Sequence, residues 1–283
     1  MFTVIIPESA KMKKLIAFLF LCSELTFAQV APLVPSTTAV ADASVASSHR
    51  WSAFSNPASL GYASVMNFGF QYENRYFLSE LSTKSIDFVL PSRLINTGIS
   101  ASYSGYSLYN EIMLGIGFSR NFSDKFSLGV QLDYYAAYFA ASDMYYGAFF
   151  PQIGLNASLS PDFHLGFSTF NPFQSIIKAV DTSKRIPSVF SLGVEYYLSP
   201  NLNFKAQVDK EISSNFRTAL GTEYSLLNFL TVKAGAYHTD YLVPCFGFST
   251  EFSSFSFNLN TELHPLLGLV SMASVRFFFK KNK

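Results

Sequence analysis

The stretch "FSLGVQLDY", Phe126 to Tyr134, alternates between apolar residues and polar or small residues. An extended chain would place these two kinds of residue on opposite faces. One face would carry Phe126, Leu128, Val130, Leu132 and Tyr134, and the other Ser127, Gly129, Gln131 and Asp133. A charge costs a few kcal/mol in hydrocarbon, so an apolar face in contact with lipid would turn Asp133 to the opposite side. The stretch therefore predicts a strand with one lipid-facing and one polar face.

The same alternation begins at Val65 and recurs to the end of the chain. It predicts fourteen strands, at about 65–73, 83–91, 97–106, 108–120, 126–139, 144–158, 163–170, 187–198, 202–211, 217–225, 230–239, 243–252, 255–263 and 268–279. An even number of antiparallel strands can close into a barrel without a free edge and returns both termini to one end. The expected fold class is all-β: a transmembrane antiparallel barrel of about 14 strands with a short N-terminal plug.

Composition agrees with a membrane barrel. The chain is 49% hydrophobic and 14% charged, and its net charge of +1 gives no basis for a nucleic-acid partner. Outside the N-terminal region no stretch approaches the roughly 18 to 20 apolar residues of a membrane helix. A chain with dispersed apolar residues would cross a membrane with strands, as bacterial outer-membrane proteins do. A soluble barrel with a core aromatic before each turn is the alternative.

The N-terminus has the pattern of a secretory signal peptide. Lys13 and Lys14 precede the apolar run from Leu15 to Cys22, and Ala28 ends the expected leader of residues 1–28. The basic residues begin just after Met12, which we expect to be the true start. A lipoprotein cysteine at Cys22 is the alternative. Residues 29–63 would form a periplasmic arm and N-terminal hatch, and 64–283 the barrel.

Five turns share one pattern of a bulky residue, serine and a short polar turn. They are "NFSDKFSLGV" from Asn121, "SLSPDFHLGF" from Ser158, "YLSPNLNFKA" from Tyr197, "EYSLLNFLTV" from Glu223 and "EFSSFSFNLN" from Glu251. Their spacing places all five at one end, and tight turns are typical of the periplasmic end, where both termini would lie. Aromatic residues near these turns would form a girdle at the membrane interface: Phe122, Tyr196, Tyr197, Tyr224 and Phe252. The less regular segments 74–82 and 171–186 would then be extracellular.

Applied to every strand, the alternation sends a set of charged residues into the lumen. The set is Glu111, Asp133, Glu195, Lys205, Asp209, Arg217, Glu223, Lys233, Glu251, Glu262 and Arg276. We expect ion pairs that hold strands and plug together, because buried charges without partners are costly. A polar path for solute is the alternative.

No catalytic motif is evident in the sequence. No serine lies in a Gly-x-Ser-x-Gly elbow, and the four histidines are scattered without metal-ligand spacing. We therefore expect a protein that is not an enzyme and has neither a cofactor nor a metal. A membrane lipid hydrolase with a Ser/His pair at the edge of the lumen is the alternative.

The segment "AVADASVASSHRWSAFSNPASLGY", residues 39–62, resembles the N-terminal segment of the fatty-acid-transporter-like outer-membrane barrels, including the PorV/PorQ group associated with type IX secretion. The resemblance rests on Asn56, Pro57, Ala58 and Leu60, which match that family's Asn-Pro-Ala turn before the first strand. It implies a fourteen-stranded barrel with a hatch lodged in the lumen. Pro57 restricts its own φ and extends Asn56, whose side chain can bond nearby backbone. The turn would lock the plug to the wall, or else be an ordinary surface turn.

The resemblance implies two functions: passage of a small hydrophobic solute sideways from the lumen, or an accessory role in a secretion machine. The first needs apolar contacts near the plug, for which Trp51, Phe54, Tyr135 and Phe150 are candidates. The second needs an outer rim that binds a protein, for which 171–186 and 74–82 are candidates. The expected partners are outer-membrane lipid and either a small hydrophobic ligand or secretion proteins. A structural or adhesion barrel without cargo is the third possibility.

Overall fold

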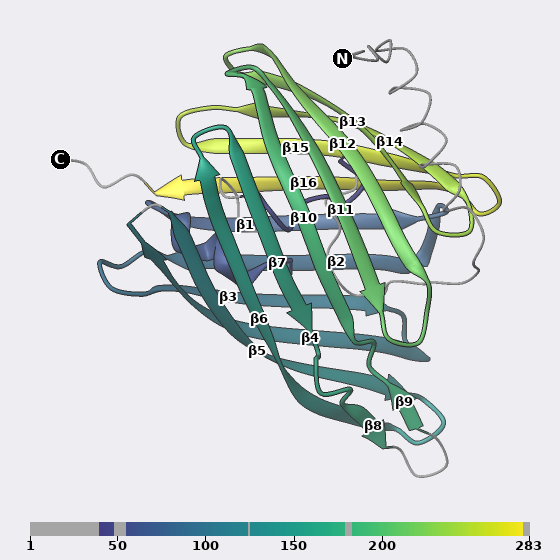
Figure 1. Cartoon of the computed structure of the whole chain (residues 1–283). Helices are drawn as coiled ribbons and strands as arrows, with labels where there is room; N and C mark the ends of the chain where they lie inside the picture. The colour runs from purple at the N-terminus through teal and green to yellow at the C-terminus, as the bar shows by residue number, and fades with distance from the viewer. Residues whose placement is uncertain (1–39, 48–54, 124, 179–182, 280–283) are drawn as a thin grey trace, which may run out of the picture.

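The computed structural model of the chain describes residues 40–47, 55–123, 125–178 and 183–279. Fourteen strands form one closed antiparallel barrel (Figure 1), in which each strand pairs with its neighbour in sequence and β1 pairs with β16. The strands are β1 (Met66–Arg75), β2 (Leu78–Leu90), β3 (Asn96–Gly105), β4 (Tyr109–Phe122), β5 (Phe126–Phe139), β6 (Met144–Ser160), β7 (Phe163–Phe170), β10 (Val189–Ser199), β11 (Leu202–Glu211), β12 (Phe216–Leu227), β13 (Leu230–His238), β14 (Leu242–Glu251), β15 (Phe255–His264) and β16 (Gly268–Phe279). The predicted barrel and its strand number are confirmed. Among the described residues, no helix has the length and hydropathy needed to span a membrane.

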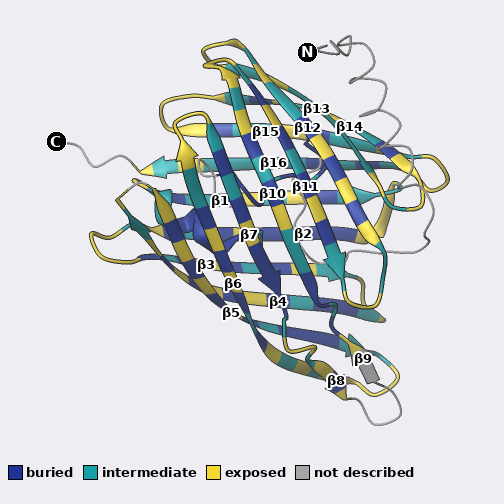
Figure 2. Ribbon diagram, viewed as in Figure 1, coloured by how far each residue is buried: buried dark blue, intermediate teal, exposed yellow. Residues whose placement is uncertain are grey.

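The two faces of each strand differ as the alternation predicts. On β5 the side chains of Leu128, Val130 and Leu132 are exposed on the outside, whereas Gln131 and Asp133 are buried on the lumen side. Bands of buried and exposed residues alternate along the strands in Figure 2. The outer surface is therefore apolar and the inner surface polar, as a barrel in a bilayer requires.

The two ends of the barrel can be distinguished by the chain termini. Met66 at the start of β1 pairs with Phe279 at the end of β16, and we call this end the terminal end. All five turns with the shared sequence pattern lie there, between β4 and β5, β6 and β7, β10 and β11, β12 and β13, and β14 and β15. The opposite end, the distal end, carries the longest connection, between β7 and β10. This connection contains the short hairpin of β8 (Ile176–Lys178) and β9 (Ser183–Arg185), and we call the whole segment from Asn171 to Ser188 the β8–β9 connection.

Residues 74–82 are not a loop, contrary to the sequence prediction. β1 runs to Arg75 and β2 begins at Leu78, so the connection is a tight turn at Tyr76 and Phe77. Both residues have positive φ, 58° and 59°, which is the geometry of a tight hairpin turn and is usually supplied by Asn or Gly. The two aromatic residues gave no turn signal in the sequence.

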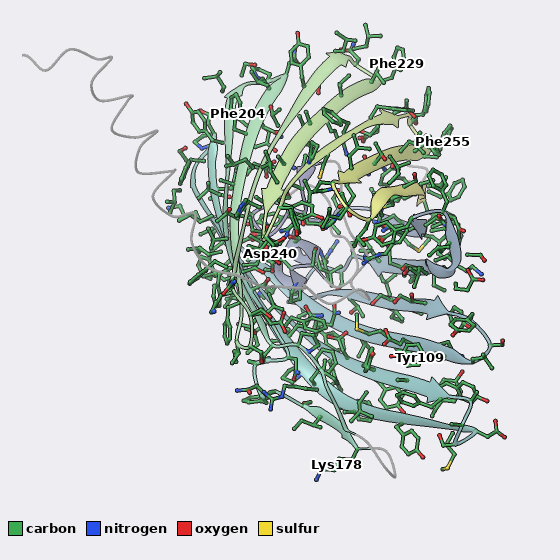
Figure 3. All side chains as sticks on the ribbon, turned by 90° about the vertical axis from the view of Figure 1, so that its right-hand side faces the viewer. Tyr109, Lys178, Phe204, Phe229, Asp240 and Phe255 are labelled. Atoms are coloured by element: carbon green, nitrogen blue, oxygen red, sulfur yellow. The ribbon has the colours of Figure 1, made fainter. Side chains whose placement is uncertain are left out.

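Aromatic side chains surround the terminal end on the outside. Phe122 stacks on Phe126, and Phe252 stacks on both Phe229 and Phe255. Figure 3 labels Phe229 and Phe255 in the upper right of the view. Tyr196, Tyr224 and Phe252 are exposed, as predicted for a girdle. Tyr197 was assigned wrongly, because it follows the outward Tyr196 on the same strand and its hydroxyl group reaches Glu195 in the lumen.

Candidate functional site

The lumen contains an inner segment, which we define as residues 40–47 and 55–63. Its 3-10 helix η2 (Pro57–Tyr62) packs against β3, β4, β5 and β6. Asn56 caps this helix: its Oδ1 accepts a hydrogen bond from the Ala58 backbone N at 2.9 Å. Asn56 Nδ2 donates to the carbonyl of Val45 at 2.6 Å, and the Asn56 amide lies 2.8 Å from that of Asn156 on β6. One fully buried amide thus joins both parts of the segment to the wall.

The rest of η2 is also held by polar side chains of the wall. The Ala58 carbonyl accepts hydrogen bonds from Ser127 Oγ at 2.8 Å and Ser119 Oγ at 3.2 Å. Asn96 Nδ2 on β3 donates to the carbonyls of Leu60, Gly61 and Ala63. Ala58 and Leu60 are fully buried. These bonds satisfy backbone groups that have no sheet partner, which is what a segment enclosed in a barrel requires.

Residues 40–47 are attached to the opposite wall. The Val45 backbone N donates to Gln207 Oε1 on β11 at 3.0 Å, and Arg217 Nη2 on β12 donates to the Ala41 carbonyl. A Cβ on Gly166 or Gly154 would collide with the inner segment, at the Val45 carbonyl and at Asn56 Oδ1 respectively. Glycine at these positions allows the backbone to approach the wall closely. Trp51 and Phe54, two of the predicted ligand contacts, lie outside the described residues.

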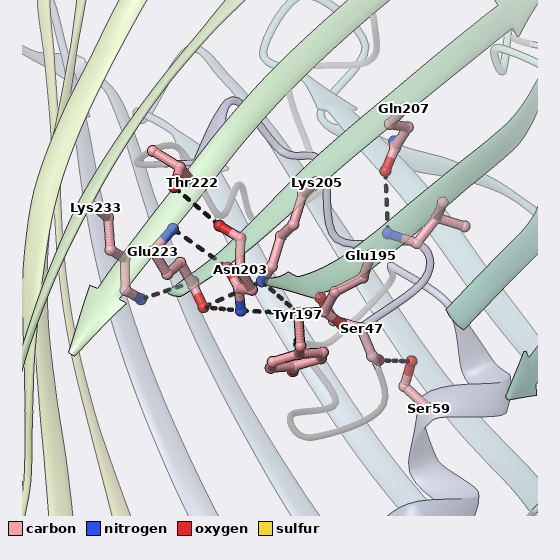
Figure 4. Close-up of polar contacts among 11 residues, drawn as sticks. Ser47, Ser59, Glu195, Tyr197, Asn203, Lys205, Gln207, Thr222, Glu223 and Lys233 are labelled. Carbon is pink, nitrogen blue, oxygen red and sulfur yellow. Dashed lines mark hydrogen bonds and ion pairs between the residues drawn. The ribbon is translucent and has the colours of Figure 1, made fainter. Parts of the chain in front are cut away.

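A network of charged residues lies beside the inner segment (Figure 4). Lys205 Nζ is 3.4 Å from Glu195 Oε1 and 3.3 Å from Glu223 Oε2, and Lys233 Nζ is 3.7 Å from Glu223 Oε1. Asn203 Nδ2 donates to both glutamates. The charges alternate in sign along β10, β11, β12 and β13, so each glutamate lies next to a lysine. This arrangement supports the structural role expected for Glu195 and Glu223.

Two arginines form further ion pairs in the lumen. Arg217 Nη1 is 2.8 Å from Asp209 Oδ2, and Arg276 Nη2 is 2.8 Å from Asp87 Oδ1. The alternation within β2 could have identified Asp87, which sequence analysis missed. Asp42 of the inner segment lies 3.8 Å from Arg217 and was also missed. These contacts join β2 to β16, β11 to β12, and the inner segment to β12.

The other predicted lumen charges have different surroundings. Asp133 is fully buried and accepts hydrogen bonds from Gln131 and Gln152, both at 2.8 Å. Glu262 lies on the lumen face of β15, whereas Glu251 is exposed where β14 ends. His164 also faces the lumen, and its Nδ1 lies 2.9 Å from Ser158 Oγ across the β6–β7 pair. The described residues include no group of three His, Cys, Asp or Glu side chains that could hold a metal.

The charged side of the lumen encloses a cavity of about 360 Å³. Its lining includes Glu195, Lys205, Glu223, Lys233 and Arg276 from the wall and Val40, Ser44 and Ser47 from the inner segment. The cavity is thus polar, with charges of both signs. It lies in the half of the lumen that faces the terminal end, because Lys233, Arg276 and Glu195 are all near the terminal ends of their strands.

The distal half of the lumen next to β4, β5 and β6 contains an apolar cluster instead. Tyr135 and Phe150, the two predicted ligand contacts that the structure describes, are buried in one cluster there. The cluster also contains Leu60 of η2, Met113, Phe170, and Ile177 and Ile186 from the β8–β9 connection. The lumen is therefore divided, with an apolar distal region above η2 and a polar region on the other side of the inner segment.

The wall is interrupted beside this apolar cluster. β6 pairs with β5 from Met144 onward, but β7 and β6 pair only from Gln152, which faces Phe170. Among the described residues, 144–151 therefore have a strand partner on one side only. The β8–β9 connection lies against this edge (Figure 1), where Ser175 Oγ donates to the Phe149 carbonyl at 3.2 Å. No sequence signal revealed the interruption except Pro151, which lacks a backbone donor and suits an unpaired edge.

Asn171 organises the connection that covers the edge. It is fully buried, its Oδ1 accepts from the Ser175 backbone N at 3.0 Å, and its Nδ2 donates to the Ile186 carbonyl at 2.9 Å. Ser188 Oγ donates to the Asn171 carbonyl. The side chain thus ties the start of the connection to its end, and Ser175 supplies the hydrogen bond to the β6 edge.

Comparisons with known proteins agree on the fold. No family model and no curated protein matches the sequence. Among solved structures, a FadL homologue of Pseudomonas aeruginosa has a TM-score of 0.61 at 13% identity, covering 88% of this chain and 99% of its own. The toluene transporter TodX of Pseudomonas putida has a TM-score of 0.56 at 12% identity, covering 90% and 98%. The outer membrane protein Omp33 of Acinetobacter baumannii has a TM-score of 0.50 at 9% identity, covering 76% and 98%.

At these identities the comparisons establish architecture rather than activity. Two features bear on that architecture: a wall of fourteen strands and an apolar outer surface. The chain has the fold of the FadL-like outer-membrane β-barrels.

Proposed function

We propose that this protein is an outer-membrane barrel that passes small hydrophobic solutes sideways from its lumen into the membrane. The observation that carries the proposal is the apolar cluster around Tyr135 and Phe150, which lies in the lumen directly beside the interrupted wall. Solved proteins of the same fold include a toluene transporter and a monoaromatic hydrocarbon channel.

The unpaired edge of β6 lies at the depth of the apolar outer surface. Phe149 and Tyr145 are exposed on the outside of β6, and Phe149 packs against Tyr134 of β5 with ring centroids 4.7 Å apart. Sheet edges do not face lipid unless protein covers them, because their backbone groups would lose water without gaining partners. The β8–β9 connection supplies the cover and acts as the gate of a lateral opening.

The inner segment favours a sideways exit of the solute from the lumen. Its helix η2 lies below the apolar cluster, and its polar bonds to β3, β4, β5 and β6 close the direct route along the barrel axis. We assign it the role of a hatch. A hydrophobic solute that reaches the cluster from the distal end meets η2 in one direction and the edge of β6 in the other.

The proposal predicts that fixing the gate stops uptake. The double variant Phe149→Cys with Ser175→Cys places two thiols where the connection meets β6, and a short bis-methanethiosulfonate reagent can bridge them reversibly. The native Cys245 is buried and does not compete. In intact cells that produce the barrel, bridging should reduce uptake of labelled toluene to the level of cells without it, and a reductant should restore uptake.

A bridge between two strands that already pair serves as the control. Phe88 and Ile99 lie opposite each other on the outer face of β2 and β3, so the variant Phe88→Cys with Ile99→Cys should take up toluene equally with and without the reagent. Equal uptake by the bridged and unbridged gate variants would rule out the lateral opening. Equal uptake by cells with and without the barrel would rule out the transport function.

An accessory role in type IX secretion is a second proposal, supported by the sequence resemblance and by the connection between β7 and β10 at the distal end. Of the two loops proposed to bind a protein, 74–82 is a strand hairpin, so 171–186 must provide the surface. Co-purification from native membranes separates the proposals. Secretion proteins would favour the accessory role, a bound hydrophobic molecule would favour transport, and neither would favour a structural or adhesion barrel.

A further inference from the structure

A carboxylate lies on the lumen face at the edge of the apolar cluster. Glu111 is near the distal end of β4 and is only 5% exposed. The Tyr109 hydroxyl group donates a hydrogen bond to Glu111 Oε1. Figure 3 labels Tyr109 near the end of its strand. A charge in this position is costly to bury, and it is placed where a solute from the distal end would first reach the apolar cluster.

The strand register places aromatic rings around this carboxylate. Glu111 lies opposite Ala137 of β5, which in turn lies opposite Tyr146 of β6. The next inward residues toward the distal end are Tyr109 and Phe139, whose ring centroids are 5.3 Å apart. Phe139 also lies 6.3 Å from the Tyr146 ring. Tyr135 is the next inward residue of β5 toward the terminal end, so rings lie on several sides of Glu111.

Small side chains flank the carboxylate in the same row. Its neighbours across the two adjacent strands are Ser104 on β3 and Ala137 on β5. A methyl and a hydroxymethyl group occupy less volume than the surrounding rings. The register therefore combines a carboxylate, small neighbours and aromatic faces within one part of the lumen wall.

A carboxylate combined with aromatic faces is the arrangement that recognises organic ammonium groups. We propose that Glu111, with Tyr109, Phe139 and Tyr146, selects solutes with an ammonium group on a hydrophobic body, in preference to neutral solutes and to carboxylates. This inference rests on the proposed function. The ammonium group lies against Glu111 and the rings, and the hydrophobic body extends toward Phe150. A carboxylate solute is disfavoured by repulsion between like charges, which is strong away from water.

Three probes with one aromatic body and different charges test the selection. Equilibrium dialysis of the full-length purified barrel would measure binding of 2-phenylethylamine, 2-phenylethanol and 3-phenylpropanoate. We expect the amine to bind most tightly and the carboxylate most weakly. The variant Glu111→Gln should reduce the affinity for the amine about tenfold or more, as loss of a hydrogen bond to a charged group does, and should leave the affinity for the alcohol nearly unchanged.

Glu251→Gln is the matched control, because this glutamate is exposed at the terminal end of β14. It should keep the order of affinities. A second variant, Tyr109→Phe, removes one hydroxyl group that bonds the carboxylate but keeps the ring, and it should retain the preference for the amine. If the alcohol binds and the amine binds no better, the inference is wrong and the proposed transport function stands. If none of the three probes binds, the inference is wrong, and the toluene uptake experiment decides the proposed function separately.

Discussion

The Asn56 side chain connects η2, residues 40–47 and the barrel wall. Its amide caps η2, bonds the Val45 carbonyl and reaches Asn156 on the wall. The flanking Pro57 begins the helix, where its missing backbone donor costs nothing. The position of Asn-Pro-Ala between leader and first strand suggested this role, but the partners on β6 and within 40–47 come from distant sequence and could not be read from the motif.

Replacing Asn56 by alanine should loosen the inner segment. The variant leaves the Val45 carbonyl and the Ala58 backbone N without the bonds that Asn56 supplies, at about 1 to 3 kcal/mol for each unsatisfied buried group. We expect faster leakage of a small polar solute from liposomes that contain the variant. Asn74→Ala, at the distal turn where Asn74 bonds the Leu78 carbonyl, is the control. Equal leakage through both variants and the parent protein would contradict the assigned role.

Glycines in the barrel wall that lie against the inner segment provide a second test of how this segment is held. Gly166→Val should displace residues 40–47, because its Cβ would overlap the Val45 carbonyl and the added methyl groups have no space. The strain of such overpacking is typically about 1 to 3 kcal/mol, so the variant should unfold at lower urea concentration and leak more. In Gly117→Ala the added Cβ meets only the flexible side chain of Gln131. That control should keep both properties.

At the scale of elements, strand positions could be predicted well and connections poorly. The predicted ranges of β5, β7, β11 and β16 match the observed ones. Apolar residues alternate with polar or small residues from Phe126 to Tyr134 of β5 and from Leu202 to Asp209 of β11. The Tyr76–Phe77 turn was missed because bulky residues occupy a geometry that usually selects glycine or asparagine. The β8–β9 hairpin was missed because each strand has only three residues, too few for a visible alternation.

Variants of the charge network test whether its ion pairs hold neighbouring strands together. The double variant Glu195→Gln with Glu223→Gln leaves Lys205, which is buried between them, without a carboxylate. Removing one side of a buried ion pair typically destabilises by about 3 to 5 kcal/mol. We expect a clear shift to lower temperature in a heat-modifiability gel, with Glu251→Gln unchanged. Altered solute passage with unaltered stability would instead favour the polar-path interpretation of the cavity.

For the whole molecule, alternation could predict the apolar outside and polar inside, because that division follows directly from the period of a strand. The separation of the lumen into an apolar distal region and a polar region could be predicted only in part from the sequence. Tyr135 and Phe150 were expected near a ligand, and they do lie together. The wall is interrupted because β7 has only eight residues and pairs with only part of the longer β6. This interruption can be recognised only from the register of β5, β6 and β7.

The differences between the two ends of the barrel predict its orientation in the membrane. The five turns with the shared sequence pattern and the aromatic girdle lie at the terminal end, and the long connection between β7 and β10 lies at the distal end. This asymmetry is typical of a periplasmic and an extracellular side, respectively. A thiol at Ser142, exposed in the β5–β6 turn of the distal end, should therefore react with a membrane-impermeant maleimide on intact cells. A thiol at Asn201, exposed in the β10–β11 turn of the terminal end, should react only after the outer membrane is opened.

The parent protein is the control for this labelling, because Cys245 is buried in the wall. Reaction of the Asn201→Cys variant on intact cells, with the Ser142→Cys variant protected, would place the termini outside. The β8–β9 connection would then face the periplasm, and solutes would first meet the polar cavity rather than Glu111 and the apolar cluster. The orientation therefore decides the direction of the proposed route, since the apolar cluster around Tyr135 and Phe150 lies toward the distal end.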